Sequence, residues 1–311
     1  MTTEHPSPPH DRGHLLWSSD EGPQRLLLAS FDRWLTSILG DDGINDLIFA
    51  DGPSIQSEII ARDHGIIAGC AAIDYMVQIW CPDIDISWKA GDGKSVKKGD
   101  TIAILKGSTT SLLKMERPML NILGQLSGIA TETHKWAKIA PRQIACTRKT
   151  IWGLLDKWAV HLGGGLTHRL TKIDAMMVKE NDLTSLKMHG ANHSERLINF
   201  LQSIDSLDVG AFLEVEVRTS KDAMIAAGTW KSLEREERLV IMLDNMKPPE
   251  CKELSEEMEE YDLRQYVLLE ASGGITINEL NDWKDCKIDV LSTSALNRGT
   301  QPLDLTMLFI E

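Results

Sequence analysis

The chain has 311 residues, a formal net charge of −13, 42% hydrophobic residues and 25% charged residues. Such a composition is typical of a globular protein with two domains, or of one large α/β barrel with additions. The acidic balance argues against nonspecific binding to nucleic acid or to anionic membranes. No apolar run reaches the roughly 18 residues of a membrane-spanning helix, so we expect no membrane partner.

The cysteines and the N-terminus indicate the compartment. The five cysteines are far apart and form no C-x-x-C pair, so they predict neither a zinc site nor a disulfide framework. Residues 1–23 are rich in proline, histidine, serine and aspartate and lack the apolar centre of a signal peptide. We therefore expect a cytoplasmic protein in which residues 1–23 are a disordered tail.

A small α+β domain is predicted after this tail. Apolar residues recur at helical spacing from Gln24 to about Gly40, and strand-like and helix-like segments then alternate. We place this domain at residues 24–130 and expect it to share the C-terminal segment 297–311. A long helical stretch, Leu112–Ile139, leads out of it.

The second part of the chain has a regular rhythm. Short apolar runs, mostly separated by helical stretches, occur at Gln143–Thr147, Ile173–Val178, Ala211–Val217, Leu239–Leu243, Tyr266–Leu269 and Ile288–Leu291. Alternation of buried strand and helix is typical of parallel βα units. The pattern predicts an α/β barrel over residues 131–296.

Polar residues follow each of these runs. In chain order they are Arg148-Lys149, Lys179-Glu180-Asn181, Glu214 with Glu216, Asp244-Asn245, Glu270-Ala-Ser-Gly-Gly274 and Ser292-Thr-Ser294. The active site of an α/β barrel is built at the carboxyl ends of its parallel strands. These endings therefore predict an active site at that edge.

Cationic side chains concentrate around the first two strand ends: Arg148, Lys149, His168, Arg169 and Lys179. An isolated lysine–arginine pair is usually a solvated surface pair, but its repetition at the next strand favours a site for a polyanion. Arginine offers a planar fork for carboxylate or phosphate, and lysine a point charge. The intervening Gly163-Gly-Gly165 is either a flexible turn or backbone that approaches a ligand closely.

Acidic and glycine-rich strand ends complement these cations. Glu216 and Asp244 carry oxygen ligands that suit ribose hydroxyls or hydrated Mg²⁺, although Asp244 could instead cap a helix. Ser272-Gly-Gly274 precedes a helical pattern and could hold a phosphate through its backbone N–H groups. Together they suggest a substrate that is both phosphorylated and hydroxylated.

A series of ordered blocks resembles the signature sequences of the quinolinate phosphoribosyltransferase family. They are Glu116-Arg-Pro-Met-Leu-Asn121, Leu126-Ser-Gly-Ile-Ala-Thr131, Thr147-Arg-Lys-Thr150, Gly163-Gly-Gly-Leu-Thr-His-Arg-Leu170, Val178-Lys-Glu-Asn181, Glu214-Val-Glu-Val217, Leu243-Asp-Asn-Met246 and Glu270-Ala-Ser-Gly-Gly-Ile275. The resemblance implies an N-terminal α+β (sandwich-like) domain followed by an open α/β barrel. It also implies a carboxylating nicotinate-nucleotide pyrophosphorylase, which uses Mg²⁺ to convert quinolinate and phosphoribosyl pyrophosphate to nicotinate mononucleotide, pyrophosphate and CO₂ in NAD synthesis.

The same resemblance implies how quinolinate would be bound. Arg148, His168 and Arg169 would bind its two carboxylates. Arg117 would reach in from the neighbouring subunit of a homodimer or a higher homo-oligomer.

The remaining implied roles concern the phosphoribosyl donor. Lys149 and Lys179 would contact substrate carboxylate or pyrophosphate, and Glu216 and Asp244 would hold the ribose and Mg²⁺. Lys149, Glu216 and Asp244 are the implied catalytic residues. The residues implied to surround the phosphate are Ser272, Gly273, Gly274 and Ser294.

This sequence departs from the family pattern at several of these positions. Cys146 stands where the family has aspartate, Asp182 where it has histidine, and Ser294 where it has a phosphate-side glycine. The loop Ile151-Trp-Gly-Leu154 is shorter than the family's by about two residues.

Three functions follow from this pattern. The first is phosphoribosyl transfer to quinolinate, which the preserved cations and acids favour. The second is a paralogous transferase for another pyridine or aromatic carboxylate, suggested by Ile151 and Trp152. The third is a catalytically silent homologue that only binds anions.

Overall fold

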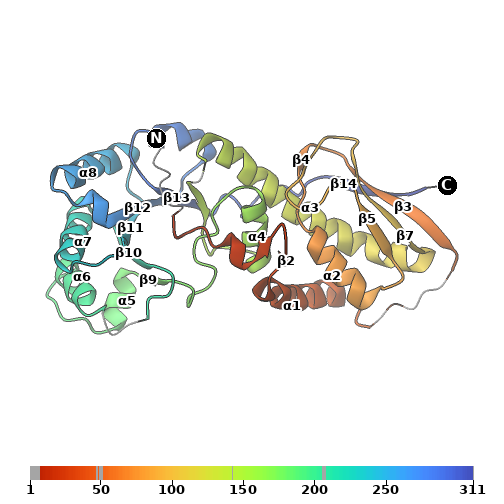
Figure 1. Cartoon of the computed structure of the whole chain (residues 1–311), viewed down its shortest axis with the longest axis horizontal. Coiled ribbons are helices and arrows are strands. Elements are labelled where there is room, and N and C mark those ends of the chain that lie inside the picture. The colour runs from red at the N-terminus through yellow and green to blue at the C-terminus, as the bar shows by residue number, and fades with distance from the viewer. Residues whose placement is uncertain (1–7, 47, 49–51, 142, 205–207, 311) are drawn as a thin grey trace. The chain divides into compact units, whose positions relative to one another are not determined.

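The computed structural model describes residues 8–46, 48, 52–141, 143–204 and 208–310 (Figure 1). Two compact units divide the chain. The barrel unit comprises the chain up to Asp11, Ile139–Arg148 and His168–Ser294. The α+β unit comprises Arg12–Lys138, Lys149–Thr167 and Ala295–Glu311.

The barrel unit contains a six-stranded sheet in the order β8-β13-β12-β11-β10-β9, and every neighbouring pair is parallel. Its strands are β8 (Ile144–Cys146), β9 (Met176–Val178), β10 (Leu213–Val217), β11 (Leu239–Asp244), β12 (Val267–Ser272) and β13 (Val290–Thr293). Each strand lies at one of the apolar runs. The predicted fold, an open α/β barrel after an N-terminal α+β region, is therefore confirmed.

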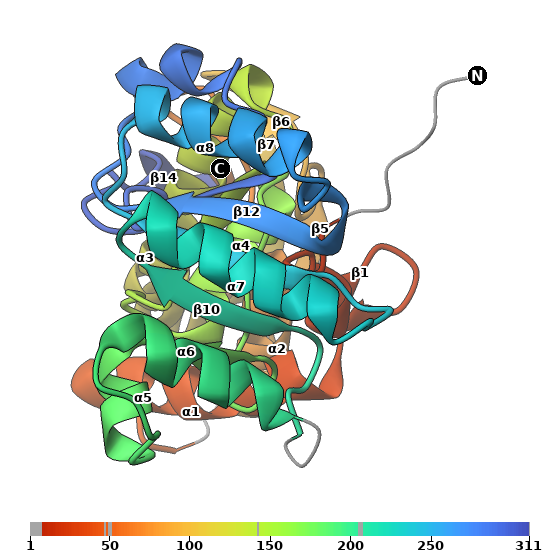
Figure 2. The same ribbon diagram turned by 90° about the vertical axis from the view of Figure 1, so that its left-hand side faces the viewer.

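Helices connect these strands. They are α5 (Glu180–Ser185), α6 (His193–Gln202), α7 (Ser220–Ser232) and α8 (Pro248–Glu260), with the 3-10 helices η3 (Arg264–Tyr266) and η4 (Ile277–Trp283). Figure 2 shows α6, α7 and α8 side by side along the sheet. The Thr219 hydroxyl caps α7 by accepting the backbone N–H of Asp222 at 3.1 Å, and proline opens α8, where a missing N–H costs nothing.

The α+β unit is built on a four-stranded antiparallel sheet in the order β14-β3-β7-β5. The strands of this sheet are β3 (Ser54–Ala61), β5 (Asp85–Trp88), β7 (Thr101–Ser108) and β14 (Leu305–Ile310). Two short antiparallel pairs accompany it: β1 (Trp17–Ser18) pairs with β2 (Gly22–Pro23), and β4 (Gly65–Ile66) pairs with β6 (Ser95–Val96). Its helices are α1 (Arg25–Asp41), α2 (Cys70–Trp80), α3 (Thr109–Ile139) and α4 (Leu154–Leu162), with η1 (Gly13–Leu15). The C-terminal strand β14 pairs with β3, so the end of the chain completes the sheet of this unit.

Two sequence-based expectations need correction. Residues 8–23, expected to belong to a disordered tail, contain η1, β1 and β2, and His10 and Leu16 in this segment are fully buried. Residues 131–138, 149–167 and 295–296, expected in the barrel domain, belong to the α+β unit. For residues 149–167 the packing of α4 gives a physical reason: Trp158 of α4 packs against Phe31 of α1, with ring centroids 5.4 Å apart.

Gly128 allows α3 to lie against the segment before β14. A Cβ atom at this position would come within 2.3 Å of the Gln301 carbonyl oxygen. We therefore expect Gly128→Ala to lower the free energy of unfolding by about 1–3 kcal/mol, as overpacking does, although alanine is the better helix former. The matched control is Gly228→Ala in α7, where a Cβ would meet nothing within 4 Å. This control should gain up to about 1 kcal/mol in urea unfolding, and equal effects at the two sites would contradict the explanation.

Among the helices of the described residues, none has the length and apolar character required to cross a membrane.

Candidate active site

Several of the predicted site residues lie at the carboxyl ends of the parallel strands. Arg148 follows β8 and Lys179 follows β9. Glu216 is the penultimate residue of β10, Asp244 ends β11, and Ser272 ends β12. Asp244 and Ser272 are direct neighbours in the strand register. The sheet thus brings together residues that are far apart in the sequence.

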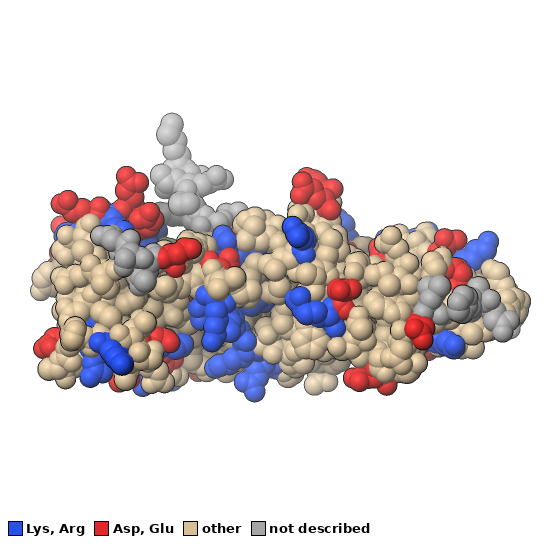
Figure 3. Space-filling model, turned by 90° about the horizontal axis from the view of Figure 1, so that it is seen from below, with Lys and Arg blue, Asp and Glu red and all other residues tan. Residues whose placement is uncertain are grey.

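A pocket of about 550 Å³ gathers the cations of this edge. Arg148, Arg169, Lys172 and Lys179 line it, with Asp182 and Asp208 as acidic neighbours. The remaining lining residues are Ile173, Met176, Met177 and Val209. Figure 3 shows lysine and arginine side chains gathered on one face of this acidic protein. Such a pocket attracts an anion of small-molecule size.

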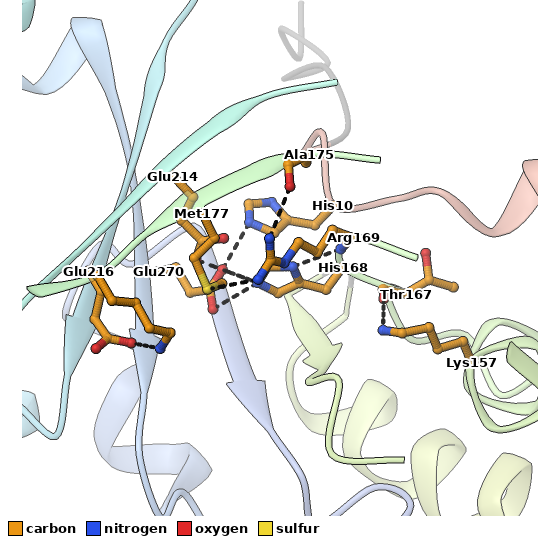
Figure 4. Close-up of polar contacts among 11 residues, drawn as sticks. His10, Lys157, Thr167, His168, Arg169, Ala175, Met177, Glu214, Glu216 and Glu270 are labelled. Carbon is orange, nitrogen blue, oxygen red and sulfur yellow. Dashed lines mark hydrogen bonds and ion pairs between the residues drawn. The ribbon is translucent and has the colours of Figure 1, made fainter. Parts of the chain in front are cut away.

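Arg169 is held by short local contacts. Its Nη1 donates to the Ala175 carbonyl oxygen at 3.1 Å and its Nη2 to the Met177 sulfur at 3.5 Å (Figure 4). Its Nε is buried and donates to none of the described residues. Burial lowers the pKa of Arg169; the carboxylate of Glu214 opposes this effect, and the nearby Arg148 guanidinium adds to it. A bound anion would raise the pKa of Arg169 again, because a nearby negative charge favours the charged guanidinium. The surroundings of Arg169 therefore suit an anionic substrate.

Lys179 forms an ion pair with Glu216 across neighbouring strands (Figure 4). The Glu216 side chain is only 10% exposed, whereas that of Lys179 is 45% exposed. Burial lowers the pKa of Lys179, against the opposing effect of Asp244. Asp182, which stands where the family has histidine, accepts the backbone N–H of Lys179 at 2.9 Å and so caps α5.

Glu216 and Asp244 fit a magnesium ion by their chemistry. Both are carboxylates, the oxygen donors that Mg²⁺ prefers, and they lie on neighbouring strands at the same edge. The Asp244 carboxylate has a long contact with Arg218, 3.4 Å from Nε, so it can turn to a cation without breaking a tight ion pair.

The glycines after β12 are suited to a phosphate. Gly273 and Gly274 are exposed and both have positive φ, 112° and 64°. A Cβ at Gly273 would come within 2.4 Å of the Asn245 side-chain oxygen, so only glycine fits there. Exposed backbone N–H groups in such a turn can bind an anion. Ser294 follows β13 and is partly exposed.

His168 does not line the cationic pocket. Its side chain is 4% exposed, and its Nε2 lies 3.0 Å from Glu270 Oε2 and 3.6 Å from Glu214 Oε1 (Figure 4). The two carboxylates raise the pKa of His168 to about 10, outweighing its burial. In this structure the His168 ring therefore contacts the two buried acids, and its expected contact with a quinolinate carboxylate stays a prediction.

The surroundings of the two buried acids shift their pKa values in opposite directions. Burial and the neighbouring Glu270 raise the pKa of Glu214. Burial would do the same for Glu270, but the imidazoles of His168 and His10 hold its pKa well below the usual range. The pKa of Glu270 therefore lies below that of Glu214.

The donor atoms of His10, His168 and Glu270 lie within 4.8 Å of one another, close enough to suggest a metal site. His168 argues against this. The backbone N–H of Arg169 donates to Nδ1 at 2.7 Å, so a neutral ring must carry its hydrogen on Nε2. A cationic ring carries a hydrogen on both nitrogens, so Nε2 is protonated there as well and Nδ1 no longer accepts from Arg169. In both states Nε2 lacks the lone pair that a metal needs and donates to Glu270 instead.

Lys149 and Arg117 belong to the α+β unit. The Lys149 carbonyl oxygen accepts a hydrogen bond from Asn297 at 3.0 Å. The carboxylate of Asp156 accepts the backbone N–H groups of Ile151 at 2.7 Å and Trp152 at 3.2 Å. The shortened loop is thus held by Asp156 and Asn297. The side chain of Arg117 is 67% exposed.

The sequence interpretation missed His10, Asp156 and Asn297. His10 lies in a proline-rich segment without periodicity, so no local pattern could have indicated its burial. Asn297 Nδ2 donates to Asp156 Oδ2 at 3.3 Å, and these two residues are 141 positions apart in the sequence. No local pattern could therefore have indicated this contact. The departure of the loop from the family length was the only available signal.

Known proteins resemble this chain along most of its length. Residues 42–127 match the N-terminal domain of quinolinate phosphoribosyl transferase and residues 129–308 match its C-terminal domain. A probable nicotinate-nucleotide pyrophosphorylase (carboxylating) of Methanothermobacter thermautotrophicus is 31% identical over 281 residues, which are 87% of this chain and 95% of that protein.

A mitochondrial quinolinate phosphoribosyltransferase (decarboxylating) of Nicotiana tabacum is 32% identical over 282 residues, covering 86% of this chain and 77% of the relative. The solved nicotinate-nucleotide pyrophosphorylase of Francisella tularensis superposes with a TM-score of 0.76 at 25% identity, covering 91% of this chain and 97% of that one. The two family domains together span most of the chain. The chain therefore belongs to the quinolinate phosphoribosyl transferase family.

Proposed function

We propose that the cationic pocket of the barrel unit binds quinolinate. The protein then transfers the phosphoribosyl group of phosphoribosyl pyrophosphate to it and releases nicotinate mononucleotide, pyrophosphate and CO₂. The observation that carries the proposal is the convergence of Arg148, Arg169 and Lys179 on one pocket of about 550 Å³. Two planar guanidinium groups match the two carboxylates of a pyridine dicarboxylate. Membership of the family supplies the reaction.

The phosphoribosyl donor would lie along the neighbouring strand ends. Lys179, and Lys149 directly after Arg148 in the chain, supply positive charge for pyrophosphate or for a substrate carboxylate. Glu216 and Asp244 would hold the ribose hydroxyls. The residues proposed around the 5′-phosphate are Ser272, Gly273, Gly274 and Ser294.

The reaction requires a negative charge near the ribose and positive charges near the pyrophosphate. Transfer to the ring nitrogen passes through a ribosyl cation, which the Glu216 carboxylate would stabilise, while the lysines offset the charge of departing pyrophosphate. Loss of CO₂ then leaves the electron pair of the broken C–C bond on the ring carbon beside the cationic nitrogen, whose positive charge stabilises it until that carbon takes up a proton from water. This step needs no protein nucleophile, in keeping with the full burial of Cys146.

Mg²⁺ belongs to this proposal. Glu216 and Asp244 would hold it, and the ion would supply further positive charge beside the pyrophosphate. We also propose a cytoplasmic location, for which the five free, buried cysteines are compatible with a reducing compartment.

An acceptor comparison tests the proposal. Purified protein is incubated with phosphoribosyl pyrophosphate, Mg²⁺ and one of quinolinate, nicotinate or phthalate, and the nucleotide products are separated. Quinolinate is expected to give nicotinate mononucleotide and to outperform the other acids. Turnover preferring another acid would favour the paralogue, and binding without turnover the silent homologue.

We propose further that the protein is a homodimer in which Arg117 of each subunit serves the partner's pocket. The side chain is exposed and its ion pair with Glu116 is 3.9 Å long, so the guanidinium is available for a further contact. Arg117→Ala and Arg169→Ala should each abolish most of the activity. Mixing the two variants under subunit exchange should restore about a quarter of it, since one mixed site keeps both arginines. Absence of any recovery in exchanged dimers would reject the shared site.

A further inference from the structure

His10 enters the barrel interior from outside both regions that match the family, which begin at residue 42. Its side chain is fully buried. Its ring centroid lies 4.8 Å from that of Phe212. It also lies 4.8 Å from that of His168, edge to face, and Figure 4 shows these two histidines side by side. The preceding Pro8 and Pro9 restrict the backbone, and the N–H of Asp11 closes a turn on the Pro8 carbonyl at 3.0 Å. The segment therefore presents one imidazole in a defined place.

Glu270 is the group that this imidazole meets. His10 Nε2 lies 2.9 Å from Glu270 Oε2, and His168 Nε2 lies 3.0 Å from the same oxygen. Glu270 is completely buried, so these imidazoles replace water as partners of its charge. His10 and His168 therefore both pair with Oε2 of this carboxylate, and its other oxygen, Oε1, lies 3.2 Å from His168 Nε2.

His168 connects Glu270 to Arg169, whose side chain lines the cationic pocket. Glu270 holds its Nε2, and the other ring nitrogen lies 2.7 Å from the backbone nitrogen of Arg169. His168 has φ of 54°, a conformation that costs free energy in a residue other than glycine and needs support from its surroundings. The guanidinium of Arg169 lines the cationic pocket. A continuous series of contacts thus joins His10 to this arginine.

We propose that His10 is a positioning residue for phosphoribosyl transfer: it fixes Glu270, which orients His168 and, through it, Arg169. This inference rests on the proposed binding of quinolinate at Arg169. It assigns to the N-terminal segment a role in substrate affinity, in addition to its packing against Phe212.

The experiment compares His10→Leu with His10→Gln. Leucine fills the space without a donor, whereas glutamine offers an amide N–H at the distance of the imidazole Nε2. The matched control is His14→Leu, the same change at an exposed histidine of the same segment. For each variant, KM for quinolinate, KM for phosphoribosyl pyrophosphate, kcat and the melting temperature are measured.

His10→Leu is expected to raise KM for quinolinate about tenfold and to change KM for phosphoribosyl pyrophosphate less than twofold. His10→Gln should recover most of the quinolinate affinity, and His14→Leu should match the wild type. A leucine variant that melts earlier but keeps the wild-type KM would overturn the proposal, as would an equal rise in both KM values or no recovery with glutamine.

Two other results are possible: a variant that does not fold and a wild-type protein without the proposed activity. If His10→Leu does not fold, His10→Asn takes its place, because its amide is one carbon too short to reach Glu270, and the same criteria apply. Failure of the underlying function is distinguishable, since the wild type itself would then form no nicotinate mononucleotide.

Discussion

Replacing Arg169 with alanine is expected to lower kcat/KM for quinolinate about 100- to 1,000-fold. Truncating one partner of a buried, hydrogen-bonded charge pair costs about 2–5 kcal/mol, and each 1.4 kcal/mol is a factor of ten. Arg169 is only 9% exposed, and its Nε–H donates to none of the described residues. The guanidinium is therefore already largely shielded from water, and little further desolvation opposes its contact with a bound carboxylate. The measurement is steady-state kinetics with quinolinate varied at saturating phosphoribosyl pyrophosphate.

Two variants sharpen this result. Arg169→Lys retains the charge but not the planar fork, so it should recover less than a tenth of the lost activity if the contact is bidentate. Arg62→Ala removes an exposed arginine, whose side chain is 58% exposed, and should leave the kinetics unchanged. An Arg169→Ala enzyme within threefold of the wild type would contradict the assignment of the pocket.

Replacing Glu216 with glutamine is expected to reduce kcat about 100-fold while changing quinolinate affinity less than threefold. The reason is that an anionic carboxylate stabilises positive charge that develops on the ribose only as the glycosidic bond breaks. Removing one such preorganised group costs about 10²–10³ in kcat in known enzymes. The Mg²⁺ concentration for half-maximal rate should also rise. Pre-steady-state mixing and Mg²⁺ titration measure the two effects separately.

The control for this substitution lies nearby. Glu180→Gln makes the same change in an acid whose side chain is 60% exposed, and we expect no loss of rate. If Glu216→Gln kept the wild-type kcat but weakened quinolinate binding, Glu216 would serve only to hold Lys179 in its ion pair.

The fold could be predicted where burial follows the local sequence. The runs at β11 and β12 are continuous and apolar, and polar or glycine residues end them, so both the strands and their active edge were predictable. Long-range packing could not be predicted in this way. The placement of α4 depends on Trp158 meeting Phe31, more than a hundred residues earlier.

The site was predictable to a similar extent. Arg148, Arg169 and Lys179 meet at one pocket, as the repeated cations suggested. His168 and Arg169 look alike as neighbours in the sequence, but the first side chain points to Glu270 and only the second lines the pocket. The buried acids Glu214 and Glu270 hold His168 away from the pocket, so only Arg169 lines it. Their partner His10 lies in a segment without any periodic pattern.

A crystal structure of the protein soaked with quinolinate tests the central claim most directly. The account predicts the pyridine ring in the pocket beside β8 and β9, with its two carboxylates within hydrogen-bonding distance of Arg148 and Arg169 and with His168 still bound to Glu270. Quinolinate bound elsewhere, with Arg148 and Arg169 unoccupied, would contradict it.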